Sequence, residues 1–70
     1  MLPLTFASTG EELTIKKVGG SPETKRHLEN LGFAPGSVIT IVNSMNGSFI
    51  INVKEARIAL SRELAQKIYV

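Results

Sequence analysis

The sequence predicts a mainly β fold: a small barrel of five to six short strands, with one α-helix inserted at about residues 22–31 and a short helical turn near 61–66. The first reason is size, since 70 residues make one domain (1–70) that buries only about 60% of the surface of its unfolded chain. The second is the absence of cysteine, which excludes disulfides as a support for so thin a core. The third is a series of short apolar segments between turn signals, which favours a sheet that closes on itself and leaves no edges.

The beginning of the chain is typical of two strands joined by a turn. We expect residues 2–6 to form a short edge strand, because Pro3 has no amide hydrogen to donate to a neighbour. A turn follows, in which Gly10 is free to take a positive φ. Residues 12–18 (ELTIKKV) then alternate between apolar and polar side chains, which predicts a half-buried strand.

The expected helix has a clear start and end. Ser21 is placed to cap its first turn, and Pro22 follows at the first helical position, where its missing N–H costs nothing. Gly32 suits a left-handed residue after the last turn, and Phe33 can fold back on that turn. One narrow apolar stripe is formed by Thr24, Leu28 and Leu31. We expect the stripe and Phe33 to anchor the helix over an open end of the barrel.

The segment after the helix is expected to form the middle of the sheet. Residues 34–37 (APGS) indicate a type II turn with Gly36 at the position that needs a positive φ. Residues 37–42 (SVITIV) are apolar on both faces, which indicates a central strand or one that curls between two packed layers. The Asn46–Gly47 pair predicts a hairpin that leads into a further strand at residues 49–53.

The C-terminal part is expected to supply two more strands. After a tight connection, residues 56–60 (ARIAL) direct Ile58 and Leu60 toward the core. Ser61 suits the cap of the short helical turn. Residues 67–70 (KIYV) then form the last strand.

Charge and hydropathy exclude several classes of function. The 8 Lys and Arg residues against 6 Asp and Glu residues give a net charge of only +2, and they are dispersed along the chain. Nucleic-acid-binding proteins cluster such residues on one face, so we expect no nucleic-acid partner, while a small basic nucleic-acid-binding barrel stays an alternative. No apolar run is long enough to span a bilayer, and the first residues lack the features of a signal peptide. We therefore expect a cytoplasmic protein.

The residues offer little support for catalysis or for a metal centre. His27 is the only histidine, the side chain that most often acts as a general base, and no serine lies in a nucleophile motif. No glycine-rich loop has the spacing of a phosphate-binding loop. Glu23 and His27 are four residues apart on the helix and could supply two metal ligands, which do not make a site. We expect no enzyme activity, no cofactor and no metal, with Glu23 and His27 as weak metal candidates.

Two large apolar residues next to loops are candidates for contact with a partner. Met45 lies in the predicted hairpin loop, and Phe33 follows the end of the helix. Large apolar groups at such places can serve as contacts for another protein. The alternatives are that Phe33 packs against the last helical turn and that Met45 folds over the barrel mouth.

The stretches KRHLENLGFAPGSVITIV and VKEARIALSRELAQKIYV resemble the FeoA family of small bacterial proteins linked to ferrous iron uptake. The matching positions are Leu4, Gly10, Ile15, Arg26, Leu28, Leu31–Gly32–Phe33, Pro35–Gly36, Arg57–Ile58–Ala59–Leu60, Ala65, Ile68 and Val70. The likeness covers essentially the whole chain, with the elements in order. The sequence departs from the family at residues 54–56, where many members have a glycine and this chain has Lys-Glu-Ala. A residue other than glycine there calls for a different turn or a bulge.

The resemblance implies an SH3-like barrel, which agrees with the strand count reached from the residues. It also implies a cytosolic accessory protein that contacts the cytosolic, GTPase-containing part of a FeoB-type ferrous iron transporter and reaches the membrane only through it. The contact residues that we expect are Lys25, Arg26, Phe33, Pro35, Met45 and Asn46. A metal-responsive regulatory module is an alternative, because the barrel is similar to the C-terminal domain of iron-dependent repressors of the diphtheria toxin type. Self-association through exposed strand edges stays open.

Overall fold

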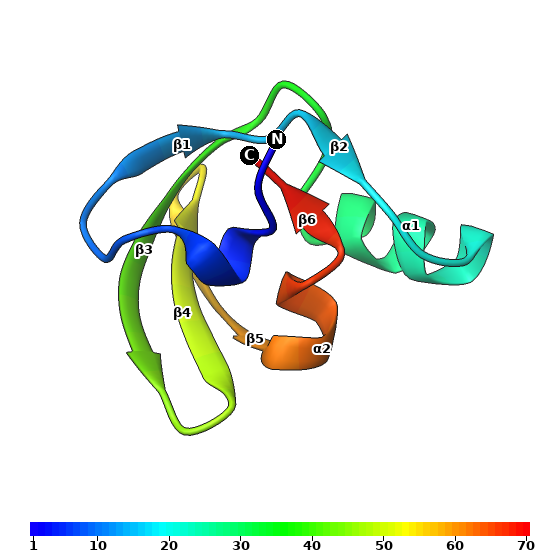
Figure 1. The fold of residues 1–70 in the computed structure, drawn as a ribbon. Coiled ribbons are helices and arrows are strands. Elements are labelled where there is room, and N and C mark those ends of the chain that lie inside the picture. The colour runs from blue at the N-terminus through cyan, green and yellow to red at the C-terminus, as the bar shows by residue number, and fades with distance from the viewer.

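The computed structural model describes all residues, 1–70, as two small β-sheets with two α-helices (Figure 1). The elements in chain order are η1 (Leu4–Phe6), β1 (Glu12–Thr14), β2 (Lys17–Val18), α1 (Pro22–Asn30), β3 (Val38–Met45), β4 (Ser48–Val53), β5 (Ala56–Ser61), α2 (Arg62–Ala65) and β6 (Ile68–Tyr69). No helix has the length and the apolar character needed to cross a membrane. The mainly β architecture with one inserted helix and a late helical turn is confirmed.

The strands form two sheets, and the expected closed barrel is wrong in this respect. One sheet has four strands in the order β1-β3-β4-β5, the other pairs β2 with β6, and all pairs are antiparallel. After β5 the chain turns at once into α2, whose start is capped by the Ser61 hydroxyl accepting a hydrogen bond from the Leu64 N–H (3.3 Å). β5 is the last strand in the order of the large sheet, and the next strand, β6, pairs with β2 instead, so β5 keeps an unpaired edge.

The expected strand at residues 12–18 is divided between the two sheets. The Ile15 N–H donates to the Ser37 carbonyl oxygen (2.9 Å), on the side of the large sheet. The Lys16 N–H donates instead to the Tyr69 carbonyl oxygen (2.8 Å), in the small sheet. The segment therefore passes from one sheet to the other between these two residues, which alternation of side chains alone does not reveal.

The N-terminal segment is mostly not a strand, which corrects the expectation for residues 2–6. Leu2 exchanges backbone hydrogen bonds with Val70, and Pro3 forms an isolated bridge to Tyr69. The chain then turns into the 3₁₀ helix η1, because the Pro3 carbonyl oxygen accepts from the Phe6 N–H (3.0 Å). This turn places Leu4 in the core with no exposed surface.

Helix α1 begins and ends as predicted, within one residue. The Ser21 hydroxyl accepts a hydrogen bond from the Thr24 N–H (3.2 Å), and Pro22 occupies the first helical position. At the other end Gly32 has φ +103°, and the Phe33 N–H donates to the Leu28 carbonyl oxygen (2.9 Å), as in a Schellman motif. Only this C-terminal end is packed, since Leu28 is the one fully buried residue of the helix.

The turns around β3 and β4 follow the sequence signals. The Ser37 N–H donates to the Ala34 carbonyl oxygen (2.9 Å), and Gly36 has φ +92°, as a type II turn requires. Strand β3 lies between β1 and β4, which confirms the central strand. In the β3–β4 hairpin Met45 pairs with Ser48 across a two-residue loop.

The β4–β5 turn shows how residues 54–56 reverse the chain without a glycine. Val53 pairs with Ala56 across Lys54 and Glu55, and the register of the two strands has no shift, so there is no bulge. Lys54 has φ +56° and is the only residue other than glycine with a positive φ. The lysine thus adopts a left-handed conformation that favours glycine.

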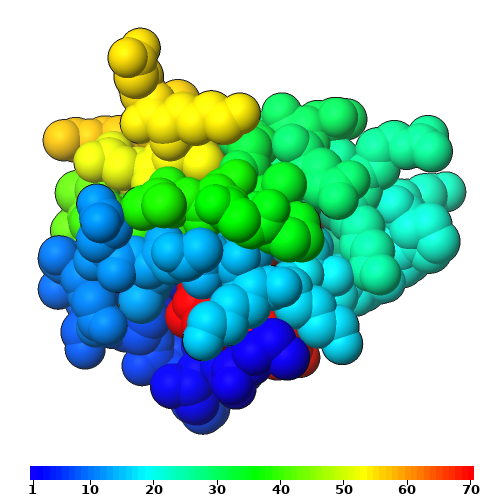
Figure 2. Space-filling view, turned by 90° about the horizontal axis from the view of Figure 1, so that it is seen from above, coloured from blue at the N-terminus to red at the C-terminus, as the bar shows by residue number.

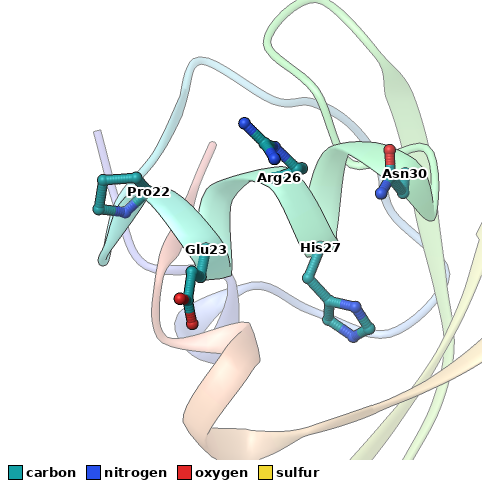
Figure 3. A pocket seen from close by; sticks show the side chains of 5 residues that line it. All are labelled: Pro22, Glu23, Arg26, His27 and Asn30. Atoms are coloured by element: carbon teal, nitrogen blue, oxygen red, sulfur yellow. The ribbon is translucent and has the colours of Figure 1, made fainter.

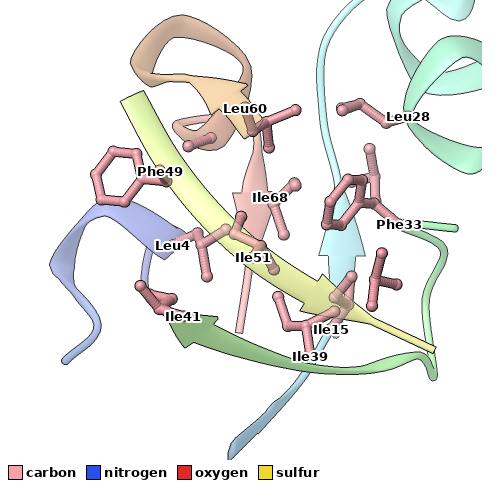
Figure 4. Close-up of a cluster of buried hydrophobic side chains, with 13 residues drawn as sticks. Leu4, Ile15, Leu28, Phe33, Ile39, Ile41, Phe49, Ile51, Leu60 and Ile68 are labelled. Atoms are coloured by element: carbon pink, nitrogen blue, oxygen red, sulfur yellow. The ribbon is translucent and has the colours of Figure 1, made fainter. Parts of the chain in front are cut away.

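The core lies between the two sheets and the packed end of α1, with η1 and α2 closing it (Figure 4). Its 13 buried residues are Leu4, Ile15, Val18, Leu28, Phe33, Ile39, Ile41, Phe49, Ile51, Val53, Leu60, Ala65 and Ile68. None of the buried residues is polar or charged. Chemistry on this protein is therefore confined to its surface.

Candidate functional site

The exposed side of α1 carries the first of two surface hollows. It has a volume of about 300 Å³ and is lined by Pro22, Glu23, Arg26, His27 and Asn30 (Figure 3). All five residues come from one helix, and none of them is apolar except for the proline ring. In Figure 3 Glu23 and His27 point to the same side of the helix, whereas Arg26 points away from them.

This hollow brings the two weak metal candidates together, as their spacing predicts. Glu23 and His27 are both exposed, and no third side chain that prefers metals joins them, since the structure contains no group of three His, Cys, Asp or Glu residues. A tightly bound first-row metal ion needs at least three protein ligands. The residues of α1 therefore do not fit a resident metal centre.

The second hollow lies at the β3–β4 hairpin, with a volume of about 260 Å³. It is lined by Ser44, Met45, Asn46, Gly47, Phe49 and Arg62. The Arg62 N–H donates to the Gly47 carbonyl oxygen (2.9 Å), which fixes the start of α2 against the hairpin loop. Met45 is 61% exposed at the rim, whereas Phe49 is 9% exposed. We call this group of residues the hairpin hollow.

The structure places five of the six expected contact residues in three different surroundings. Met45 and Asn46 share the hairpin hollow, Lys25 and Arg26 are exposed on α1, and Pro35 is exposed in the turn before β3. Figure 1 shows α1 and the tip of the β3–β4 hairpin at opposite sides of the molecule. The basic residues of α1 and the hairpin residues therefore do not form one contiguous patch.

The sixth expected contact residue, Phe33, requires a correction. Its side chain has no exposed surface, and it packs in the core together with Leu28. The reason is the helix end itself: the Schellman motif turns the residue after Gly32 back onto the last turn and into the interior. Phe33 is a structural residue, as the alternative interpretation had it, and it offers no surface to a partner.

Sequence reasoning did not single out two residues of the hairpin hollow. Phe49 and Arg62 lie 13 positions apart in the chain, and the antiparallel pairing of β4 with β5 brings the ends of these strands together. The available signal was the tight connection at residues 54–55, since a two-residue turn there pairs residue 53 with 56 and, in the same register, residue 48 with 61. Phe6 was also not singled out, although it is 72% exposed on η1.

Comparison with known proteins gives one consistent result. The family model described as the FeoA domain matches residues 2–70. A candidate Fe(2+) transport protein A of Methanocaldococcus jannaschii is 39% identical over 70 residues, which covers 100% of this chain and 85% of the relative.

Two solved structures extend this comparison to the fold. The crystal structure of an iron uptake regulatory protein (FeoA) superposes with a TM-score of 0.88 at 25% identity, covering 96% of this chain and 91% of that one. Stenotrophomonas maltophilia FeoA complexed with zinc, described as an SH3 domain protein, superposes with a TM-score of 0.84 at 19% identity, covering 99% and 88%. The expected SH3-like fold is thereby confirmed, although its two sheets do not close into a barrel.

Proposed function

Because this chain belongs to the FeoA family, we propose that it is a cytoplasmic, non-enzymatic adaptor that docks on the cytosolic part of a FeoB-type ferrous iron transporter and modulates it. The family is one of ferrous iron transport, and the relative from Methanocaldococcus jannaschii carries the same description. An accessory role requires a surface that recognises another protein. The hairpin hollow supplies one.

The observation that carries the proposal is the composition of the hairpin hollow. Methionine, arginine and aromatic side chains are enriched in protein–protein interfaces relative to the rest of the surface. Here Met45 stands 61% exposed beside Arg62, with Phe49 lining the same hollow. The flexible thioether side chain of Met45 can adapt to a partner surface, and Arg62 offers several hydrogen-bond donors.

The basic residues of α1 have a separate part in the proposal. Lys25 and Arg26 are exposed, and they lie too far from the hairpin to fill the same pocket. Exposed charges of this kind raise the rate of encounter with an acidic partner more than they raise affinity. Changes at these two residues are therefore expected to lower the association rate and its salt dependence, and to leave the dissociation rate nearly unchanged.

The test is an amide chemical-shift titration of labelled protein with the soluble cytosolic domain of the transporter. We expect localised shifts at Met45, Asn46 and Arg62. Replacing an exposed methionine with serine removes contact area without opening a cavity, so Met45→Ser is expected to weaken binding at least about fivefold at unchanged stability. Val38→Ser is the matched control, because Val38 is also exposed (50%) on β3 but at the opposite end of the strand. Equal losses in both variants, or shifts confined to other surfaces, would contradict this docking site.

A metal-responsive module is the second candidate, favoured by one observation. Glu23 and His27 line the same hollow on α1, and the similar structure from Stenotrophomonas maltophilia is a complex with zinc. With two protein ligands, binding would be weak and exposed. Titration with zinc and then with ferrous ion distinguishes the candidates. Metal sensing would be supported if the metal shifts the amide signals of Glu23 and His27, if His27→Ala abolishes these shifts, and if Asn30→Ala retains them. Spectra that do not change on adding either ion would exclude it.

A further inference from the structure

The outer face of the small sheet carries a row of side chains with a distinct chemistry. Lys17 of β2 lies directly opposite Tyr69 of β6, and its Nζ is 6.0 Å from the centre of the tyrosine ring. Pro3 forms its bridge to Tyr69 from the other side, so the three side chains form one row on the same face of the sheet. Lys67 lies in the turn before β6, and its carbonyl oxygen accepts a hydrogen bond from the Gly19 N–H (2.6 Å), so these two residues continue the row set by Lys17 and Tyr69. We call Pro3, Lys17, Gly19, Lys67 and Tyr69 the lysine–tyrosine face.

The neighbouring residues show that this face points to solvent. Val18 and Ile68, which alternate with Lys17 and Tyr69 along the two strands, are buried in the core. Figure 1 shows β2, β6 and the N-terminal segment running beside one another. In Figure 2 a few C-terminal atoms (red) are visible between the N-terminal segment (dark blue) and the cyan residues, while the rest of the red segment lies behind other residues in this view.

The charge of the face is of one sign. Residues 1–10, 13–22 and 64–70, which make up the face and its surroundings in the sequence, contain no Asp or Glu. Lys67 is half-buried. A Cβ at Gly20 would stand 2.9 Å from Lys67 Cδ, so the aliphatic part of the lysine side chain lies against the backbone at Gly20. A lysine whose stem is packed in this way loses less conformational entropy when its ammonium group binds an anion.

Gly19 is the feature that the fold itself does not explain. It is absent from the residues with a positive φ, and a Cβ at this position would meet only the Lys67 carbonyl oxygen at 3.5 Å and Tyr69 Cε2 at 3.6 Å, which are ordinary contacts. Neither the backbone conformation nor the available space therefore requires glycine here. A side chain would, however, stand against the edge of the Tyr69 ring. Glycine in an extended segment often marks a place where another chain approaches the backbone closely.

We propose that the lysine–tyrosine face docks an acidic polypeptide segment of a partner protein. Carboxylates of the segment would accept hydrogen bonds from the ammonium groups of Lys17 and Lys67 and from the Tyr69 hydroxyl, while its backbone passes over Gly19. This interaction is separate from the proposed function, because no residue of the face belongs to the hairpin hollow.

Two features favour a polypeptide over other anionic partners. Base stacking by single-stranded nucleic acid needs a free aromatic face, whereas Tyr69 is half-buried and has the Lys17 ammonium beside its ring. Attachment to a lipid surface needs exposed apolar side chains beside the lysines. None of the five residues of the face is itself an exposed large hydrophobic residue, but Met1 (70% exposed) and Leu2 (56% exposed) lie beside it in the N-terminal segment, so the vesicle arm of the experiment decides this alternative.

The experiment measures binding of a fluorescein-labelled deca-glutamate peptide by fluorescence anisotropy, together with amide shifts of the labelled protein. We expect shifts at Lys17, Gly19 and Tyr69. Lys17→Glu is expected to weaken binding at least about fivefold more than Lys16→Glu, which changes the net charge equally at the adjacent exposed position, before β2 and outside its register with Tyr69. Gly19→Ala is expected to weaken binding of the peptide without changing the melting temperature of the protein. If Gly19 had only a structural role, its replacement would change the melting temperature and not the binding.

The outcomes separate this proposal from its alternatives and from the docking site at the hairpin. Equal losses for Lys16→Glu and Lys17→Glu would overturn the proposal, because they would show an effect of net charge alone. Tighter binding of a ten-nucleotide oligothymidine or of phosphatidylglycerol vesicles to the same residues would overturn the choice of a polypeptide. Met45→Ser is expected to retain deca-glutamate binding. The test of the lysine–tyrosine face therefore stays valid even if the hairpin hollow does not bind the transporter.

Discussion

Lys54 holds a backbone conformation that costs free energy, and its replacement by glycine should stabilise the protein. Its φ of +56° lies in the left-handed region, which costs an L-residue with a Cβ roughly 1–2 kcal/mol. Glycine avoids this cost but gives up roughly 0.5–1 kcal/mol through the greater freedom of the unfolded chain. The Lys54 side chain is exposed and makes no hydrogen bond, so its removal loses little else. We therefore expect Lys54→Gly to raise the free energy of unfolding by about 0.5–1 kcal/mol.

Urea denaturation followed by far-ultraviolet circular dichroism measures this change directly. With a slope of about 1 kcal/mol per molar urea for so small a domain, the midpoint should rise by about 0.5–1 M. The melting temperature should rise by about 2–8 °C, since 1 kcal/mol corresponds to roughly 4–8 °C in a domain of this size.

Two control variants separate the backbone effect from the effect of charge. Lys54→Ala removes the charge but keeps the Cβ, so it should bring no gain. Glu55→Gly lies in the same turn at a residue without a positive φ, and it should destabilise the protein by roughly 0.5–1 kcal/mol. If Lys54→Ala stabilises the protein as much as Lys54→Gly, or if Lys54→Gly destabilises it, the reasoning from the backbone conformation is refuted.

Changes at three further residues test the packed end of α1 and its cap. Gly32→Ala should destabilise by roughly 1–2 kcal/mol or more in urea denaturation, because Gly32 has φ +103° and a Cβ there would stand 3.2 Å from Val53 Cγ2. Phe33→Ala should cost about 3–5 kcal/mol, enough to unfold much of the protein at 37 °C in a thermal melt; a folded variant with unchanged stability would contradict its place in the core. Ser21→Ala should cost about 1 kcal/mol and Ser21→Asp almost nothing, and equal losses in both variants would show that the cap contributes no stability.

The result expected for Phe33→Ala also changes how Phe33 can be used in binding experiments. The residue follows a helix end, and sequence alone allowed it to be either a contact or a core residue. Because the side chain is fully buried, lost binding in a Phe33 variant would report unfolding. Met45, whose side chain is 61% exposed, is the residue whose replacement tests docking without this complication.

Much of the fold follows from local signals. The Ser21–Pro22 start and the Gly32 stop of α1, the type II turn at Gly36 and the hairpin at Gly47 all depend on a few adjacent residues. Each such signal acts through backbone conformation or a hydrogen bond within about four residues, so it can be recognised without knowledge of the rest of the chain.

The candidate sites were less predictable, because they depend on residues that are distant in the sequence. The pair Glu23–His27 was predicted, since both residues lie on one helix. The approach of Arg62 to Met45 requires the pairing of β4 with β5, and the row of Pro3, Lys17 and Tyr69 requires three segments from both ends of the chain. Periodicity gives no information on which strands pair.

The sequence by itself determined the fold class, the family, the helix with its caps, the turns, and the apolar faces of β3 and β4. Only the tertiary structure decided that residues 12–18 divide between two sheets, that residues 4–6 turn into a 3₁₀ helix, and that β5 keeps an open edge. It also decided that Phe33 is buried. The physical reason is that caps and turns are stabilised by neighbours in the chain, whereas sheet closure and burial depend on which distant segments fill the same core.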